Sequence, residues 1–155
     1  MAEMAALQLD LVAREVPLQY PGAEGVVFQD AVVVVRNTGA VSAARIGLLC
    51  TVVNEGKPMV DRLVDLTPLG FAETLRPGAE GTVSFFRLLQ REARGFGSKV
   101  NLFGYRAVLN WTYELTATPV AGPDAVPAGT ERRWRVRWHP SETNPALVAV
   151  EIRPG

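Results

Sequence analysis

The most restrictive feature of this sequence is the alternation of apolar and polar residues over residues 105–117. A β-strand places successive side chains on opposite faces of a sheet. We therefore expect a strand here, with its odd-numbered side chains in a core and its even-numbered ones facing solvent. The odd-numbered residues are Tyr105, Ala107, Leu109, Trp111, Tyr113, Leu115 and Ala117.

Other short runs of β-type residues recur along the chain, separated by turn residues. The valine-rich run at residues 26–36 is apolar on both faces at its centre, residues 32–35, which predicts a strand inside a sandwich. A strand is also expected at residues 43–54. Further strands are predicted at residues 7–12, 59–66, 82–89, 132–138 and 146–152, and one short helix at residues 88–94.

Two segments rich in turn residues, residues 91–100 and 119–130, are predicted to be long loops without regular structure. The predicted fold is all-β: an immunoglobulin-like antiparallel β-sandwich of about eight strands with long loops. Its length suits one domain over residues 1–155, with residues 1–6 as a flexible N-terminal segment.

A five-residue turn signal occurs twice, as Pro-Gly-Ala-Glu-Gly at residues 21–25 and again at residues 77–81. Proline presets φ for the first central position of a type II turn, and glycine tolerates positive φ at the second. We expect two equivalent corners of the sandwich at these segments.

These turns carry a resemblance to a known family. Pro21-Gly22 before the valine-rich run, Arg36-Asn37-Thr38-Gly39, Leu75-Arg76-Pro77-Gly78 and Ser141-Glu142-Thr143-Asn144 resemble bacterial cell-adhesion-related (CARDB-like) immunoglobulin-like domains. The resemblance spans residues 20–153. The chain departs from the family pattern at Pro145 and in its long Pro/Gly loop. The resemblance implies the fold and a binding or structural role, and it implies no catalytic residues.

The composition argues against several classes of protein. The net charge is zero, so no nucleic acid or membrane partner is expected. The single cysteine excludes an internal disulfide, and no window approaches 18 consecutive apolar residues. Residues 1–6 lack a cationic start and a long apolar run, so we expect no signal peptide and a cytoplasmic origin. If the protein is a virion component, it would then be incorporated into a virion. A mature domain cut from a longer secreted chain would instead be extracellular.

Residues that could carry catalysis or hold a metal do not form a known motif. His139 is the only histidine, and neither Ser141 nor any other serine lies in a nucleophile-elbow sequence. The glycine-rich residues 95–99 lack the order of a phosphate-binding loop. Asp61 and Asp65 share a strand face and are too sparse for a calcium loop. We therefore expect no enzymatic activity, no cofactor and no metal site.

One segment combines charge and aromatic residues. Residues 132–138 alternate so that Arg133, Arg135 and Arg137 point to one side of a strand while tryptophans point to the other. Residues 87–139 contain nine basic and four acidic residues, a net charge of +5, which leaves −5 for the remainder. The arginines form a solvated face, a docking patch for an acidic partner, or a nucleic-acid contact. Nucleic-acid binding is disfavoured because exposed aromatics would have to accompany the arginines.

The resulting functional hypothesis is a non-catalytic structural or interaction protein that acts as a subunit of a larger assembly. A bacteriophage capsid decoration protein or other virion component would be an example. It would bind a protein partner or itself, as a homo-oligomer, through Arg133, Arg135, Arg137 and the loop at residues 119–130, near a sheet edge. The alternative is a cell-surface adhesion or carbohydrate-binding module from a longer secreted protein.

The alternation at residues 43–54 generates a prediction about Cys50. It shares a strand face with Ile46, Leu48 and Val52, and a free cysteine on such a face behaves as a small hydrophobe. We expect a thiol reagent to label the native protein slowly and the urea-unfolded protein quickly. Equal labelling rates in the two states would contradict a buried thiol.

Overall fold

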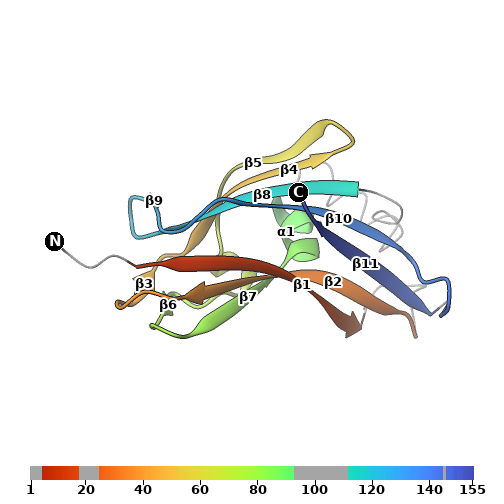
Figure 1. The fold of residues 1–155 in the computed structure, drawn as a ribbon, viewed down its shortest axis with the longest axis horizontal. Coiled ribbons are helices and arrows are strands. Elements are labelled where there is room, and N and C mark those ends of the chain that lie inside the picture. Colours follow the sequence, from red (N-terminus) through yellow and green to blue (C-terminus); the bar gives the residue numbers. More distant parts are fainter. Residues whose placement is uncertain (1–4, 18–24, 93–111, 145) are drawn as a thin grey trace.

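The computed structural model describes residues 5–17, 25–92, 112–144 and 146–155. Within these ranges the chain is mostly β-structure, with one short α-helix and one 3-10 helix (Figure 1). The elements are β1 (Leu7–Pro17), β2 (Val27–Asn37), β3 (Ala43–Ala44), β4 (Gly47–Asn54), β5 (Lys57–Asp65), η1 (Thr67–Leu69), β6 (Thr74–Leu75), β7 (Glu80–Ser84), α1 (Phe85–Glu92), β8 (Thr112–Ala121), β9 (Val126–Pro127), β10 (Arg132–Pro140) and β11 (Leu147–Pro154).

The main sheet has the strand order β1-β2-β11-β10-β8-β4-β5. Strand β7 pairs with β2 and β9 pairs with β8, while β3 and β6 form a separate two-stranded ribbon. All pairings are antiparallel except that of β11 with β2. The prediction of an all-β fold is therefore confirmed.

The two edges of β2 are used differently, and this divides the sheet into two layers. Strand β1 pairs with β2 along its whole length. The opposite edge is shared, since β11 pairs with Val27 and Phe28 and β7 pairs with residues 32–36. In Figure 1, β1, β2 and β7 lie below, β4, β5 and β8 lie above, and α1 is drawn between them.

Side chains complete the hydrogen bonding where β2 passes from one partner to the other. The indole Nε1 of Trp138 in β10 donates to the Gln29 carbonyl oxygen at 2.8 Å. The Val150 N–H donates to Gln29 Oε1 at 2.9 Å. The carboxylate of Asp30 accepts hydrogen bonds from the Ser84 hydroxyl and from the Phe86 N–H. Polar groups at this buried junction are thus satisfied without a continuous ladder.

An aromatic cluster centred on Trp138 joins the two layers. The indole ring is stacked between Phe28 of β2 and Phe85 of α1, with centroid separations of 5.8 and 5.7 Å. Tyr113 of β8 meets the same ring edge-on at 5.6 Å. Because Trp138, Phe28, Phe85 and Tyr113 are fully buried, this cluster forms the centre of the hydrophobic core.

Helix α1 corrects two expectations. A strand was expected at residues 82–89 and a helix at 88–94, but β7 ends at Ser84 and the helix begins at Phe85. Ser84 Oγ accepts the Arg87 N–H at 3.0 Å, which is an N-cap, and Asp30 adds a second acceptor. The apolar residues then follow a helical period, burying Phe85, Phe86, Leu88 and Leu89.

The predicted loop at residues 119–130 is also wrong. Strand β8 continues to Ala121, and β9 pairs with it through Val120↔Pro127 and Ala121↔Val126. Proline is accommodated in β9 because this short strand lies off the main path of the sheet and needs few donors.

Most other strand predictions are confirmed with changed ends. The expected strand at residues 43–54 is broken at Arg45, whose φ of 51° turns the chain from the β3–β6 ribbon into β4. Of the alternating segment at residues 105–117, Tyr113, Leu115 and Ala117 are buried as expected. Residues 105–111, with Trp111, lie outside the described residues.

The turn at residues 77–81 and the burial of Cys50 are confirmed, whereas residues 21–24 of the first predicted turn lie outside the described residues. Gly78 has a φ of 80°, and the Ala79 N–H donates to the Arg76 carbonyl at 3.0 Å, as in a type II turn. Cys50 is 3% exposed, and burial, with a smaller effect from Glu92, raises the pKa of its thiol to about 12. In the described part of the chain, no helix has the length and apolar character needed to cross a membrane.

The central position of Trp138 leads to a stability prediction. We expect Trp138→Ala to lower the free energy of unfolding by about 3–5 kcal/mol, because it removes a buried aromatic ring and leaves a cavity. Trp138→Phe keeps a ring but loses the Nε1 donor, so its loss should be smaller. Urea denaturation of the three proteins tests this, and a loss below about 1 kcal/mol for the alanine variant would contradict it.

The Asp30 carboxyl predicts a dependence of stability on pH. Burial, partly offset by hydrogen bonds from Ser84, Phe86 and Ala31, raises the pKa of Asp30 from 3.8 to about 6. The folded state therefore holds more protons than the unfolded state between these values, so Asp30 makes the free energy of unfolding fall as pH rises through this window. Two pKa units correspond to about 3 kcal/mol.

The comparison is between the native protein and Asp30→Asn, which cannot titrate at this position. Urea denaturation at about pH 4, 5, 6 and 7 should show the variant gaining stability relative to the native protein, by up to about 3 kcal/mol across the series. A stability difference that stays constant over this range would refute the raised pKa.

Candidate functional site

Strand β10 presents the predicted arginines on the face turned away from the core. Arg133, Arg135 and Arg137 are exposed, and Trp134, Val136 and Trp138 between them are buried, so the predicted alternation is confirmed. The expected position near a sheet edge is wrong, because β8 pairs with one edge of β10 and β11 with the other. The hairpin through the turn at residues 141–144 brings β11 onto the edge that was expected to be free.

The arginines belong to a network of exposed charges. Arg133 pairs with Glu131 at 3.3 Å, and Arg135 pairs with Glu114 of β8 at 3.5 Å. On β11, Arg153 pairs with Glu151 at 2.9 Å. Arg137 has no ion pair within the described ranges. Solvated pairs of this kind add little to stability, so their side chains are available for other contacts.

A hollow of about 510 Å³ lies over the end of this network, and we call it the β10 hollow. It contains Arg135 and Arg137 but not Arg133, so the structure brings only two of the three predicted site residues together. The lining residues are Val53, Glu55, Gly56, Thr112, Glu114, Arg135, Arg137, Glu151 and Arg153.

The arginines share their face with apolar side chains that were not singled out from the sequence. We call the solvent side of β5, β4, β8, β10 and β11 the outer face. Leu49 of β4 and Leu63 of β5 are directly paired in register on this face and are 44% and 47% exposed. Asp61 and Asp65 of β5 lie on the same side, as expected from their spacing. The outer face therefore combines an apolar area with charges of both signs.

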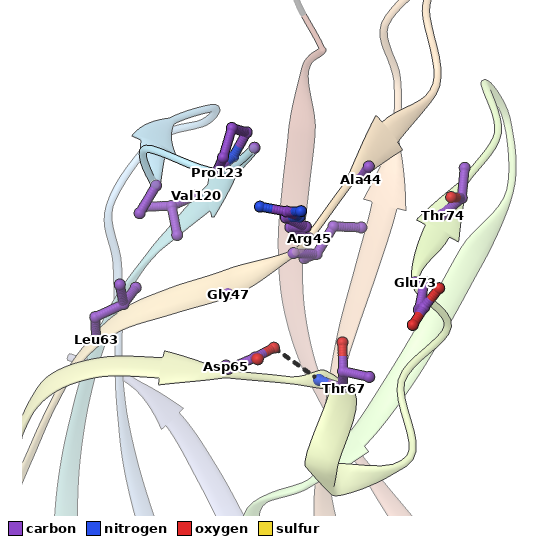
Figure 2. A pocket seen from close by; sticks show the side chains of 13 residues that line it. Ala44, Arg45, Gly47, Leu63, Asp65, Thr67, Glu73, Thr74, Val120 and Pro123 are labelled. Carbon is purple, nitrogen blue, oxygen red and sulfur yellow. Dashed lines mark hydrogen bonds between the residues drawn. The ribbon is translucent and has the colours of Figure 1, made fainter.

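A second hollow, of about 610 Å³, opens where β3 passes into β4, and we call it the β3–β4 pocket (Figure 2). In this view Arg45 lies between Val120 and Pro123 on one side and Glu73 and Thr74 on the other. The lining residues are Ala44, Arg45, Ile46, Gly47, Leu63, Asp65, Thr67, Glu73, Thr74, Val120, Gly122, Pro123 and Ala125.

Unusual backbone geometry or a close approach to the backbone occurs at three residues that line this pocket. Arg45 and Ala125 have φ values of 51° and 48°, in the left-handed region that side-chain-bearing residues rarely adopt. A Cβ at Gly47 would lie 2.8 Å from the Val64 carbonyl oxygen and 3.3 Å from a methyl of Val120. A side chain at Gly47 would therefore clash with the neighbouring strand β5.

The charged side chains of the β3–β4 pocket make few contacts with other described residues. One oxygen of Asp65 accepts the Thr67 N–H at 3.0 Å at the start of η1. Arg45, Asp65 and Glu73 form no ion pairs with described residues. The pocket thus presents a guanidinium, two carboxylates and several apolar side chains, and it could contact charged groups of either sign. Sequence reasoning missed it, because the pocket forms only where β3 pairs with β6 and β4 pairs with β5 and β8, which are contacts between distant segments.

The residues weighed earlier for catalysis are engaged in local structure. His139 lies in β10, with Nδ1 3.2 Å from the Pro140 carbonyl oxygen. Ser141 Oγ accepts the N–H groups of Thr143 and Asn144 and so organises the β10–β11 turn. Among the residues described, no group of three or more His, Cys, Asp or Glu side chains is placed to hold a metal. Residues 95–99 lie outside the described ranges.

Comparison of this chain with known protein families, curated proteins and solved structures finds no match.

Proposed function

We propose that this protein is a non-catalytic structural subunit of a larger protein assembly, built on an immunoglobulin-like sandwich. The strand neighbours support that fold. Strands β1, β2 and β7 have the relation of strands A, B and E, and β5, β4, β8 and β10 that of C′, C, F and G. Strand β11 is an addition, and its parallel pairing with β2 departs from that pattern. The resemblance of the turn signals to those of CARDB-like domains supports the same assignment.

The observation that carries the proposal is the outer face itself. It is a broad sheet surface with exposed Leu49 and Leu63 beside the β10 arginines. Buried aromatic residues lie directly beneath it and hold β10 in place, since Trp138 is hydrogen-bonded to β2 and stacked on two rings. A rigid, partly apolar and charged surface of this kind suits docking onto another protein.

The partner class follows from the alternation along β10. Arg133, Arg135 and Arg137 project from the outer face, while Trp134 and Trp138 are buried on the other side. A single-stranded nucleic acid would need aromatic rings exposed beside the cations for base stacking. We therefore propose a protein partner with carboxylate groups. A bacteriophage capsid decoration protein is one example of a subunit that works in this way.

The test compares two triple variants. Arg133→Ser/Arg135→Ser/Arg137→Ser removes the outer-face cations, and Arg14→Ser/Arg36→Ser/Arg76→Ser removes three exposed arginines from elsewhere. Binding to a poly-glutamate peptide is measured at about 0.05 M and 0.3 M salt, because screening weakens exposed ion pairs. We expect the outer-face variant to bind about tenfold more weakly or worse at low salt, while the control changes less.

Near-ultraviolet circular dichroism establishes that both variants keep the native packing. Single-stranded DNA of matched charge serves as the competing ligand. Equal loss of poly-glutamate binding in both variants, or tighter binding of DNA than of the peptide, would refute an acidic protein as the partner.

A further inference from the structure

One row of side chains across the outer face pairs an acid with a base at its two ends. The strand registers connect Asp61 of β5 to Thr51 of β4, then to Thr116 of β8 and to Arg133 of β10. Asp61 and Arg133 are exposed, and Thr51 Oγ1 donates to Asp61 Oδ1 at 3.4 Å. Read across the four strands, the row is acid, threonine, threonine, base.

This row is complementary in charge to the same row read in the opposite direction, because the acid at one end would then lie opposite the base at the other. Neighbouring strands are about 4.8 Å apart, so Asp61 and Arg133 are separated by about 14 Å and do not pair within one chain. Consider two copies whose outer faces meet, related by a twofold axis that runs parallel to the strands, midway between β4 and β8. This axis reverses the order of the row in the second copy. Two copies facing each other across that axis would place Asp61 of each opposite Arg133 of the other.

The neighbouring row supplies apolar contact for the same arrangement. It contains Leu63, Leu49 and Thr118, joined by the same registers. The axis would bring Leu49 of one copy opposite Thr118 of the other, and removal of the exposed Leu49 side chains from water favours association. Two facing sheets related in this way have aligned strands about 10 Å apart, the usual packing of sandwich layers.

We propose that the partner of the outer face is a second copy of this chain, docked face to face about a twofold axis between β4 and β8. The inference rests on the proposed function, since it uses the same face, and it identifies the partner. A second copy is favoured as the partner because the face carries both Asp61 and Arg133, at equal distances on either side of the proposed axis. Isologous contacts of this kind close on themselves as dimers.

The existing contact of Arg133 is compatible with the dimer. Its pair with Glu131 is mostly solvated, with side chains 67% and 51% exposed, and competes weakly for the guanidinium. The Asp61–Arg133 contacts act chiefly on specificity and on alignment of the two copies.

Charge exchange tests the dimer directly. Sedimentation velocity measures the dimerisation of the native protein, Asp61→Arg, Arg133→Asp and the double variant Asp61→Arg/Arg133→Asp, from about 1 μM to about 500 μM. Each single variant places like charges opposite each other twice, so we expect dimerisation about tenfold weaker or worse. The double variant restores opposite charges at both contacts, and so does an equimolar mixture of the two single variants, so both should regain dimers.

Two variants on β1 serve as matched controls for the change in charge. Glu15→Arg and Arg14→Asp alter exposed residues of the other layer by the same amounts and should leave dimerisation within about twofold of native. The proposal is overturned if the native protein stays monomeric throughout the range, or if neither the double variant nor the mixture recovers the dimer.

The outcomes also separate this inference from the proposed function. If the protein is monomeric but its binding of poly-glutamate still depends on the β10 arginines, a second copy is excluded as the partner. The proposal of a different, acidic protein partner then stands. If the dimer responds to charge exchange as expected but poly-glutamate binding does not depend on the arginines, only the proposal of self-association stands.

Discussion

The structure depends on the shared edge of β2, where the Trp138 indole donates to the Gln29 carbonyl. A strand that passes from one partner to another leaves ladder groups without backbone partners, and a buried polar group left unsatisfied costs about 1–3 kcal/mol. Gln29 Oε1 receives the Val150 N–H, and Asp30 receives the Ser84 hydroxyl and the Phe86 N–H. These side-chain contacts allow the sheet to divide while its interior remains hydrogen-bonded. They also explain why a carboxyl that is only 4% exposed is found in the core.

Stability and the proposed docking surface are coupled through β10. The inner side chains of this strand are Trp134, Val136 and Trp138, which pack in the core, and the side chains between them are the outer-face arginines. Because the period of a strand is two, the contacts of Trp138 with β2 and α1 also determine how the arginines are presented. A change that slips the register of β10 by one residue would exchange the two sets.

The β10 hollow and the β3–β4 pocket differ in character. The β10 hollow is lined by two solvated ion pairs, Arg135–Glu114 and Arg153–Glu151, whereas the lining of the β3–β4 pocket includes backbone in the left-handed region at Arg45 and Ala125. Left-handed backbone at non-glycine residues persists only where the surrounding structure requires it. Here the ribbon of β3 and β6 and the extension of β8 by β9 hold the chain in place. The proposed dimer uses the surface between these hollows, where Leu49, Thr51 and Thr116 lie.

The sequence by itself determined the all-β fold, the inward side of Cys50 and the outward side of the β10 arginines, because strand alternation depends only on neighbouring residues. It did not determine α1, whose cap is completed by Asp30, 54 residues earlier than Ser84. It also did not determine that β10 is internal, that β8 extends into the expected loop, or that Arg45 opens a pocket. Those features depend on contacts between segments distant in the chain, and only tertiary packing selects which strand lies beside which.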